Sequence, residues 1–237
     1  MFTKYFQEQT KFLQESLKLR LEKKGITPPT EKDLKLFKEF YDFIKDHIPV
    51  GFSLAMGKVR NRTHVLNKNC DLIVYRKWCK NFLKLTGGYI LTDQIYSFLS
   101  IENELTTESL LKHVELTQSI KTMYAMDYDL PEERFIPLYS ILFAYKSRVP
   151  LLSHKLSMVH ASEEKGIPIT QEVDMLCVLD QGIIIKDWEQ GTFKIIETNE
   201  DTLMWFYILF IEFLDRDNEL KLDLRSYIKE QKQYVEK

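Results

Sequence analysis

The chain has 237 residues, a formal net charge of −2 and 44% hydrophobic residues. This length and composition allow a sizeable hydrophobic core, in either one large domain or two small ones. The charge excludes a generally basic nucleic-acid-binding protein, so any contact with phosphates would depend on a local cluster of lysine and arginine.

The cysteines, the N-terminal segment and the longest apolar run all predict a soluble cytoplasmic protein with no membrane partner. Cys70, Cys79 and Cys177 lack the paired spacing of a zinc site, which indicates reduced thiols. The first residues contain no apolar segment of a secretory signal. The longest apolar run, residues 203–214, contains Glu212 and is too short to span a bilayer.

Two helices are predicted before the first strand. Residues 5–24 carry apolar side chains at helical spacing, and Gly25 is a suitable residue to end that helix. A second helix is expected to begin at Thr30, which can cap its first turn. Glu31 would lie in that first turn, where the helix dipole favours an acid, and a functional role for it is an equally good interpretation.

Seven strands and four more helices are predicted after these two helices. The strand segments are rich in β-branched and aromatic residues, whereas the helical segments repeat apolar residues every three or four positions. We expect strands at 50–60, 71–75, 95–104, 138–145, 175–179, 183–185 and 193–196, and helices at 105–124, 151–162, 202–214 and from 220 onwards. Because no linker or repeat divides the chain, residues 1–237 should form one α/β domain, with an N-terminal helix at 1–24, a core at 25–216 and a C-terminal helix at 217–237. The apolar stripe of 203–214 is expected in the core or at the surface of a homodimer.

Three carboxylates are predicted to meet where two of these strands lie side by side. Asp71 begins one strand, and Glu102 and Glu104 end the other on the same side, because side chains alternate along a strand. Like charges repel in such a cluster unless a cation lies between them. Oxygen ligands suit Mg²⁺, Mn²⁺ or Ca²⁺ better than zinc. The ordinary alternative is three solvated acids at strand ends.

Basic residues flank this acidic cluster in the sequence. They could contact a phosphate backbone on either side of the carboxylates, although a run of charges is more commonly a solvated face. They are Lys58, Arg60, Arg62, His64 and Lys68 on the predicted hairpin, followed by Arg76, Lys77, Lys80 and Lys84. The histidines show no metal-ligand spacing, and we expect each of them at the surface or satisfied by hydrogen bonds. These are His47, His64, His113, His154 and His160.

The order of the predicted elements resembles the core of the PD-(D/E)XK, or restriction-endonuclease-like, nuclease superfamily. More closely, it is similar to an uncharacterised bacterial and phage family of that superfamily. The resemblance extends from about residue 25 to 214, and its stretches are 25–31, 51–59, 69–74, 98–106, 138–145 and 173–182. It implies a mixed central sheet flanked by helices, with helical extensions at both ends of the chain.

The resemblance also implies a site. A working member of the superfamily has an acid on the first helix, an Asp that opens one strand and Glu-x-Lys on the next. Glu31, Asp71 and Glu102 match the three acids and would hold Mg²⁺ or Mn²⁺, but Glu104 stands where the lysine belongs. Glu104 could still act as a general base, and Lys112 on the following helix could bring an ammonium group nearby.

A second alignment of this motif is open. In it, Ser100 and Glu102 occupy the Glu-x-Lys positions, and the site would be inactive. The sequence therefore supports two functions. One is a metal-dependent nuclease that hydrolyses phosphodiester bonds in DNA or RNA, favoured by the carboxylates beside a basic hairpin. The other is an inactive protein of the same fold that binds nucleic acid or protein in phage defence or immunity, favoured by the missing lysine.

Overall fold

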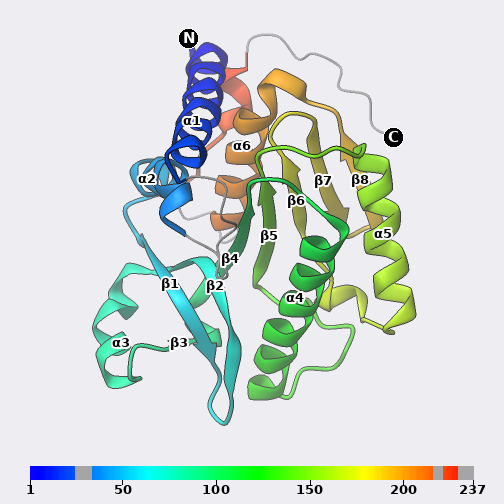
Figure 1. Ribbon diagram of the computed structural model, residues 1–237. Coiled ribbons are helices and arrows are strands. Elements are labelled where there is room, and N and C mark those ends of the chain that lie inside the picture. The colour runs from blue at the N-terminus through cyan, green and yellow to red at the C-terminus, as the bar shows by residue number, and fades with distance from the viewer. Residues whose placement is uncertain (25–33, 216–220, 229–237) are drawn as a thin grey trace.

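The computed structural model describes residues 1–24, 34–215 and 221–228. Their centre is one sheet of eight strands in the order β3-β1-β2-β4-β5-β6-β7-β8, shown in Figure 1. The strands are β1 (Phe52–Arg60), β2 (Val65–Arg76), β3 (Ile90–Leu91), β4 (Ile95–Glu102), β5 (Tyr139–Ala144), β6 (Met175–Val178), β7 (Gly182–Asp187) and β8 (Thr192–Ile196). All seven predicted strands are present, and β3 is an addition.

The sheet is mixed, as expected. The strands β4, β5 and β6 run parallel to one another, whereas β2 is antiparallel to both β1 and β4. The pairs β6–β7 and β7–β8 are antiparallel as well. β3 was missed because it has two residues, and its parallel pairing with the end of β1 shows only in three dimensions.

Helices cover both faces of the sheet. They are α1 (Phe2–Lys24), α2 (Lys38–His47), α3 (Phe82–Leu85), α4 (Thr107–Tyr128), α5 (Leu151–Glu164) and α6 (Thr202–Leu214), with short 3-10 helices at Leu34–Phe37, Lys77–Asn81, Thr92–Gln94, Ile169–Gln171, Asn199–Asp201 and Leu224–Tyr227. Side chains of α1, α2 and α6 pack on one face, and those of α4 and α5 pack on the other, where Figure 1 shows these two helices in front of the strands.

The termini of the chain differ in part from the expectation. Gly25, Thr30 and Glu31 lie outside the described residues, and the second helix is described from 34 onwards. The expected C-terminal helix is described only as far as Ile228, and that part holds the single 3-10 helix Leu224–Tyr227 in place of an α-helix. Among the described residues, no helix is both long and apolar enough to cross a bilayer.

Aromatic residues fill the core on the α1 and α6 face. The rings of Phe40 and Phe143 stack with their centroids 4.1 Å apart, and Phe206 packs edge-on against Phe143 at 5.2 Å. Six residues of the apolar stripe on α6 are buried within this single chain: Leu203, Phe206, Ile208, Leu209, Ile211 and Leu214. The stripe therefore belongs mainly to the core, because water is already excluded from these side chains without a second subunit.

A capped helix and a bulged strand set the geometry of the region around Asp71. Thr106 caps α4, since its hydroxyl accepts a hydrogen bond from the backbone nitrogen of Ser109, as expected for a Thr at this position. The β1–β2 pairing changes register where Ala55 pairs with Ile73 and Gly57 with Cys70, so that β2 advances three residues while β1 advances two. A bulge of this kind re-aims side chains and is common near functional sites.

Candidate functional site

An open cleft lies between β2, β4 and the first half of α4. Its volume is about 680 Å³, and we call it the carboxylate cleft. The residues that line it are Lys68, Asn69, Asp71, Ser100, Glu102, Thr106, Glu108, Ser109, Lys112, His113, Glu115 and Leu116. Asp71 and Glu102, two of the three predicted carboxylates, thus share one cleft, although they are 31 positions apart in the sequence.

Asp71 is fixed by the backbone of the neighbouring strand. It lies inside β2 and not at its start, because β2 begins at Val65. The pairing of Leu72 with Leu99 brings Asp71 beside the end of β4, where its Oδ2 accepts a hydrogen bond from the backbone nitrogen of Ile101 at 2.7 Å. A backbone donor holds the carboxylate in one orientation.

Glu104 lies outside the carboxylate cleft, so the prediction that three carboxylates converge is wrong. The extended backbone of β4 ends at Glu102, and the alternation of faces ends with it. The Glu104 carboxylate forms ion pairs with Lys146 at 3.3 Å and with Arg148 at 2.5 Å, and 24% of the side chain is exposed. Among the described residues, no three His, Cys, Asp or Glu side chains are grouped closely enough to hold a metal ion.

Two basic side chains of the prediction, Lys112 and Lys68, line the carboxylate cleft. Lys112 Nζ donates a hydrogen bond to Glu108 at 2.6 Å. This bond raises the pKa of Lys112, and the negative charge of Glu102 adds to the rise. Lys68 pairs with Glu115 at 3.3 Å. The cleft therefore has cationic side chains on the side of β2 and on the side of α4.

The other predicted basic residues are distributed around β1 and β2. Lys58 is opposite Asn69, and Arg60 pairs with Val65 next to the hairpin turn. The guanidinium group of Arg62 lies 5.7 Å from the centre of the Tyr128 ring. These three residues follow the hairpin beyond Lys68, but none of them lines the cleft.

Arg76 and Lys77 lie at the opposite end of β2 from the hairpin turn. Arg76 Nε donates a hydrogen bond to the hydroxyl of Tyr96 at 2.6 Å. Lys77 lines a separate hollow of about 550 Å³ together with residues of β1 and of the α2–β1 connection. Neither residue lines the carboxylate cleft.

A buried hydrogen-bond network supports the wall of the cleft, and sequence reasoning missed most of it. His113 is 2% exposed, and its Nδ1 lies 2.8 Å from the hydroxyl of Ser100, which lines the cleft together with Asp71. Its Nε2 lies 3.0 Å from the hydroxyl of Ser140. The expectation that His113 is satisfied by hydrogen bonds is confirmed, and its two serine partners join α4 to both β4 and β5.

The same network ends in a buried ion pair. Asp174 Oδ2 accepts hydrogen bonds from the backbone nitrogen of Ser140 at 2.7 Å and from Lys121 Nζ at 2.8 Å. Burial lowers the pKa of Lys121 and raises that of Asp174, and each partner's charge opposes the shift of the other. The signal in the sequence was a lysine four residues after Thr117, on the apolar face of α4.

Comparison with known proteins identifies the fold. No protein-family model matches the chain, and no curated protein is similar to it in sequence. Among solved structures, cAAA-bound NucC of P. aeruginosa ATCC27853 has a TM-score of 0.64 and 11% identity, over 90% of this chain and 91% of that one. For cAAA-bound NucC of E. coli MS115-1 the TM-score is 0.64 with 10% identity, over 90% of each chain. For the apo form of E. coli MS115-1 NucC the TM-score is 0.61 with 13% identity, over 87% of this chain and 89% of that one. The chain therefore has the NucC fold, with an eight-stranded mixed sheet between helices.

Proposed function

We propose that this protein is a metal-dependent nuclease that hydrolyses phosphodiester bonds at the carboxylate cleft. One observation carries the proposal: Asp71 and Glu102, from adjacent strands of a sheet with the NucC fold, line the same open cleft. The fold match to NucC, a phage-defence nuclease, supports the same reaction class and the same biological setting for this chain.

The oxygen donors of the cleft fit a magnesium or manganese ion. Asp71 and Glu102 supply carboxylates, and Asn69 and Ser100 supply an amide and a hydroxyl oxygen in the same cleft. Mg²⁺ is commonly bound through one or two carboxylates while waters and substrate phosphates complete its shell, so two are enough. The bound ion would stabilise negative charge on the phosphate and lower the pKa of a bound water.

The protein's own residues would orient the substrate and balance its charge. The backbone nitrogen of Ile101 holds the Asp71 carboxylate in place, so little reorganisation is needed when a cation arrives. Lys112 is the best candidate for the ammonium group that the motif lacks, because it lines the cleft opposite the two carboxylates. Lys68, and beyond it Arg60 and Arg62 on the hairpin, would contact neighbouring phosphates of the nucleic acid.

A second candidate function is favoured by the same geometry. Ser100 and Asp71 line the same cleft, which agrees with the alignment in which Ser100 and Glu102 occupy the Glu-x-Lys positions. In that case the protein would bind nucleic acid, or a partner protein, without cutting.

Two of the similar structures hold cAAA, and we propose that this ligand be present in one arm of every activity assay.

Metal binding and cleavage distinguish the two functions. Mn²⁺ and Mg²⁺ would be titrated calorimetrically into the wild type, Asp71→Asn and the control Glu104→Gln, a carboxylate outside the cleft. A panel of single- and double-stranded DNA and RNA would be incubated with each protein, with and without cAAA. Binding and cleavage that Asp71→Asn abolishes and Glu104→Gln preserves would support the nuclease. Nucleic-acid binding without metal binding or cleavage, in both arms, would support the inactive form.

A further inference from the structure

Ser100 brings a hydroxyl group to the same face of β4 as Glu102. The two residues are two positions apart on an extended strand, so their side chains lie on one face, and both line the carboxylate cleft. Ser100 is partly exposed, so a phosphate bound in the cleft can reach it. Two carboxylates are enough for a magnesium ion, which leaves this hydroxyl group available to the substrate.

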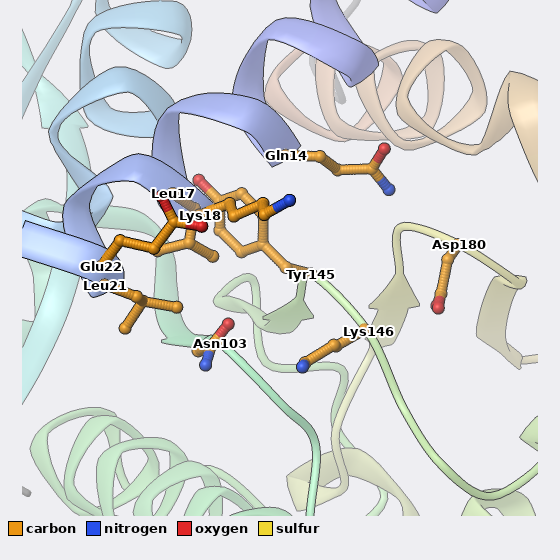
Figure 2. Close-up of a pocket in the computed structure, with 9 residues that line it drawn as sticks. All are labelled: Gln14, Leu17, Lys18, Leu21, Glu22, Asn103, Tyr145, Lys146 and Asp180. Carbon is orange, nitrogen blue, oxygen red and sulfur yellow. The ribbon is translucent and has the colours of Figure 1, made fainter. Parts of the chain in front are cut away.

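Backbone hydrogen bonds fix the end of the strand that carries Ser100. The backbone nitrogen of Tyr145 donates to the carbonyl oxygen of Glu102 at 3.0 Å, and that of Leu105 donates to the carbonyl oxygen of Lys146 at 2.9 Å. Tyr145 and Lys146 also line a separate pocket of about 390 Å³ beside α1, which is shown in Figure 2. A side chain on a strand held in this way is positioned more precisely than one on a loop, so the direction of the Ser100 hydrogen depends on its hydrogen-bond partners.

Four side chains form one hydrogen-bonded chain that begins at Ser100. Its hydroxyl contacts Nδ1 of His113 at 2.8 Å, and Nε2 of His113 contacts the hydroxyl of Ser140 at 3.0 Å. The Ser140 hydroxyl in turn contacts that of Thr117. His113, Ser140 and Thr117 are at most 2% exposed. Among the described residues, the hydroxyl groups of Ser140 and Thr117 have no further partner. The chain therefore has one end in the cleft and a closed end in the core.

Counting hydrogen atoms gives the direction of this chain. Each hydroxyl supplies one hydrogen and an uncharged imidazole supplies one, so three contacts leave one of the four hydrogens over. If Ser100 donated to His113, the remaining hydrogen would belong to Ser140 or Thr117 and would lie in the core without an acceptor, which is unfavourable. If Thr117 donates to Ser140, Ser140 to His113 and His113 to Ser100, every buried hydrogen has an acceptor. A charged imidazole also donates to Ser100, so the direction at Ser100 is the same in both charge states.

We infer that Ser100 is a hydrogen-bond donor to a non-bridging oxygen of the substrate phosphate, and that His113 is the residue that positions it. The inference rests on the proposed nuclease, in which the cleft holds a phosphodiester. A hydroxyl held as a donor can stabilise the charge that develops on the phosphate oxygens, in addition to Lys112. Because His113 donates to it, Ser100 cannot pass its proton to His113 and is not a nucleophile of the serine–histidine kind.

The protonation of His113 Nδ1 tests the direction of the chain without any cleavage. The ¹⁵N chemical shifts of the histidine rings would be measured at pH 7.5 in long-range ¹H–¹⁵N spectra of the full protein labelled with ¹⁵N-histidine. His113 would be assigned by elimination, from Gln variants of the other four histidines. We expect a hydrogen on Nδ1 of His113. A hydrogen on Nε2 alone would mean that Ser100 donates to His113, and it would overturn the inference.

Cleavage of sulfur-substituted substrates tests the contact with the phosphate. With Mn²⁺, single-turnover rates would be compared for a cleaved oligonucleotide of the panel and for its two phosphorothioate diastereomers, in which sulfur replaces one non-bridging oxygen at the cleaved bond. Ser100→Ala should slow the ordinary substrate by about tenfold or more, because the donor is removed. The loss should be about threefold smaller, or less still, for the diastereomer with sulfur at the contacted position, since sulfur is a weak acceptor.

The matched control for Ser100→Ala is Ser119→Ala. The Ser119 hydroxyl donates to a carbonyl oxygen of its own helix at 2.7 Å, and the residue lines neither the cleft nor the hydrogen-bonded chain. Its removal should leave the rate within about twofold of the wild type, because such local bonds contribute little to a distant site.

A second pair of variants tests whether His113 acts through Ser100. His113→Gln should slow cleavage by about threefold or more in the wild type and by less than about twofold in Ser100→Ala, because the hydroxyl that it positions is then absent. Ser140→Ala, which keeps the imidazole but removes the donor to Nε2, should give the same pattern and replaces His113→Gln if that variant does not fold. Equal losses with and without the Ser100 hydroxyl would show that these residues support the fold and do not position Ser100.

The outcomes separate this inference from the proposed nuclease. A wild type that cleaves, with an equal effect of Ser100→Ala on all three substrates, would overturn the phosphate contact and leave the nuclease intact. A wild type that cleaves nothing, with and without cAAA, would overturn the nuclease and the phosphate contact together. The protonation of Nδ1 would then still decide whether Ser100 is held as a donor.

Discussion

The carboxylate of Asp71 accepts a hydrogen bond from the backbone nitrogen of Ile101, and this 2.7 Å contact ties the bulged part of β2 to the end of β4. It gives Asp71 a structural role besides the proposed chemical one. The two roles can be separated, because an amide oxygen can accept the same hydrogen bond but carries no charge.

Asp71→Ala and Asp71→Asn should therefore differ in stability but agree in metal binding. Ala leaves the Ile101 nitrogen without its acceptor, which should lower the free energy of unfolding by about 1–3 kcal/mol. Asn should lower it by less than about 1 kcal/mol, because the acceptor is retained. Both substitutions should lower the affinity for Mn²⁺ by about tenfold or more, since each removes a charged ligand. Urea unfolding and calorimetry measure the two quantities, and equal stabilities of the two variants would contradict the structural role.

Glu104→Gln should have little effect on either property. Its ion pairs with Lys146 and Arg148 are near the surface, where such pairs contribute at most about 1 kcal/mol. The Mn²⁺ affinity should stay within about twofold of the wild type, a difference of about 0.4 kcal/mol. A tenfold loss of affinity would mean that Glu104 reaches the ion after all, by a rearrangement of residues 103–104.

Lys112→Ala should reduce cleavage without preventing metal binding. Loss of the ammonium group removes a positive charge near the phosphate, which should lower the rate of cleavage by about 10²–10³-fold if Lys112 replaces the missing motif lysine. The matched control is Glu108→Gln, which releases Lys112 from its ion pair and should leave the rate unchanged or higher. Single-turnover cleavage of a labelled oligonucleotide gives both rates. Equal activity of Lys112→Ala and the wild type would exclude this role.

His154 should make the fold less stable in mildly acidic solution. It is 1% exposed, and burial lowers its pKa below the ordinary value of 6.5. The unfolded chain therefore binds more protons than the folded chain, so the free energy of unfolding falls as the pH drops below about 6.5. Urea unfolding at pH 7.5 and 5.5 should show a larger loss for the wild type than for His154→Gln. An equal loss in both proteins would assign the acid sensitivity to other groups.

The arrangement of strands could be predicted from the sequence because it follows from local patterns. Runs of β-branched and aromatic residues marked seven of the eight strands, and turn residues marked most of their ends. The meeting of Asp71 and Glu102 followed from the adjacency of two such strands. Thr106 was one of two residues expected to begin α4, and its hydroxyl does cap that helix.

What the sequence did not predict depends on partners that are distant in the chain. Glu104 leaves the cleft because the strand ends two residues before it, and because Lys146 and Arg148, more than 40 positions later, provide opposite charges. Lys121 lies on the apolar face of α4, but nothing near it in the sequence indicates that Asp174 is its partner. The pocket of about 390 Å³ beside α1 is lined by one helix and by residues that follow three strands, a combination that no local pattern describes.

Residues 102–105 are held at both ends by backbone hydrogen bonds to residues 145 and 146, and these bonds constrain the length of this segment. A substitution at Asn103 changes one side chain and leaves both backbone bonds in place. An insertion or deletion between Glu102 and Leu105 would break one of the two bonds, and it would also displace Thr106 from the start of α4. This connection should therefore vary in composition among descendants of this chain and keep a constant length.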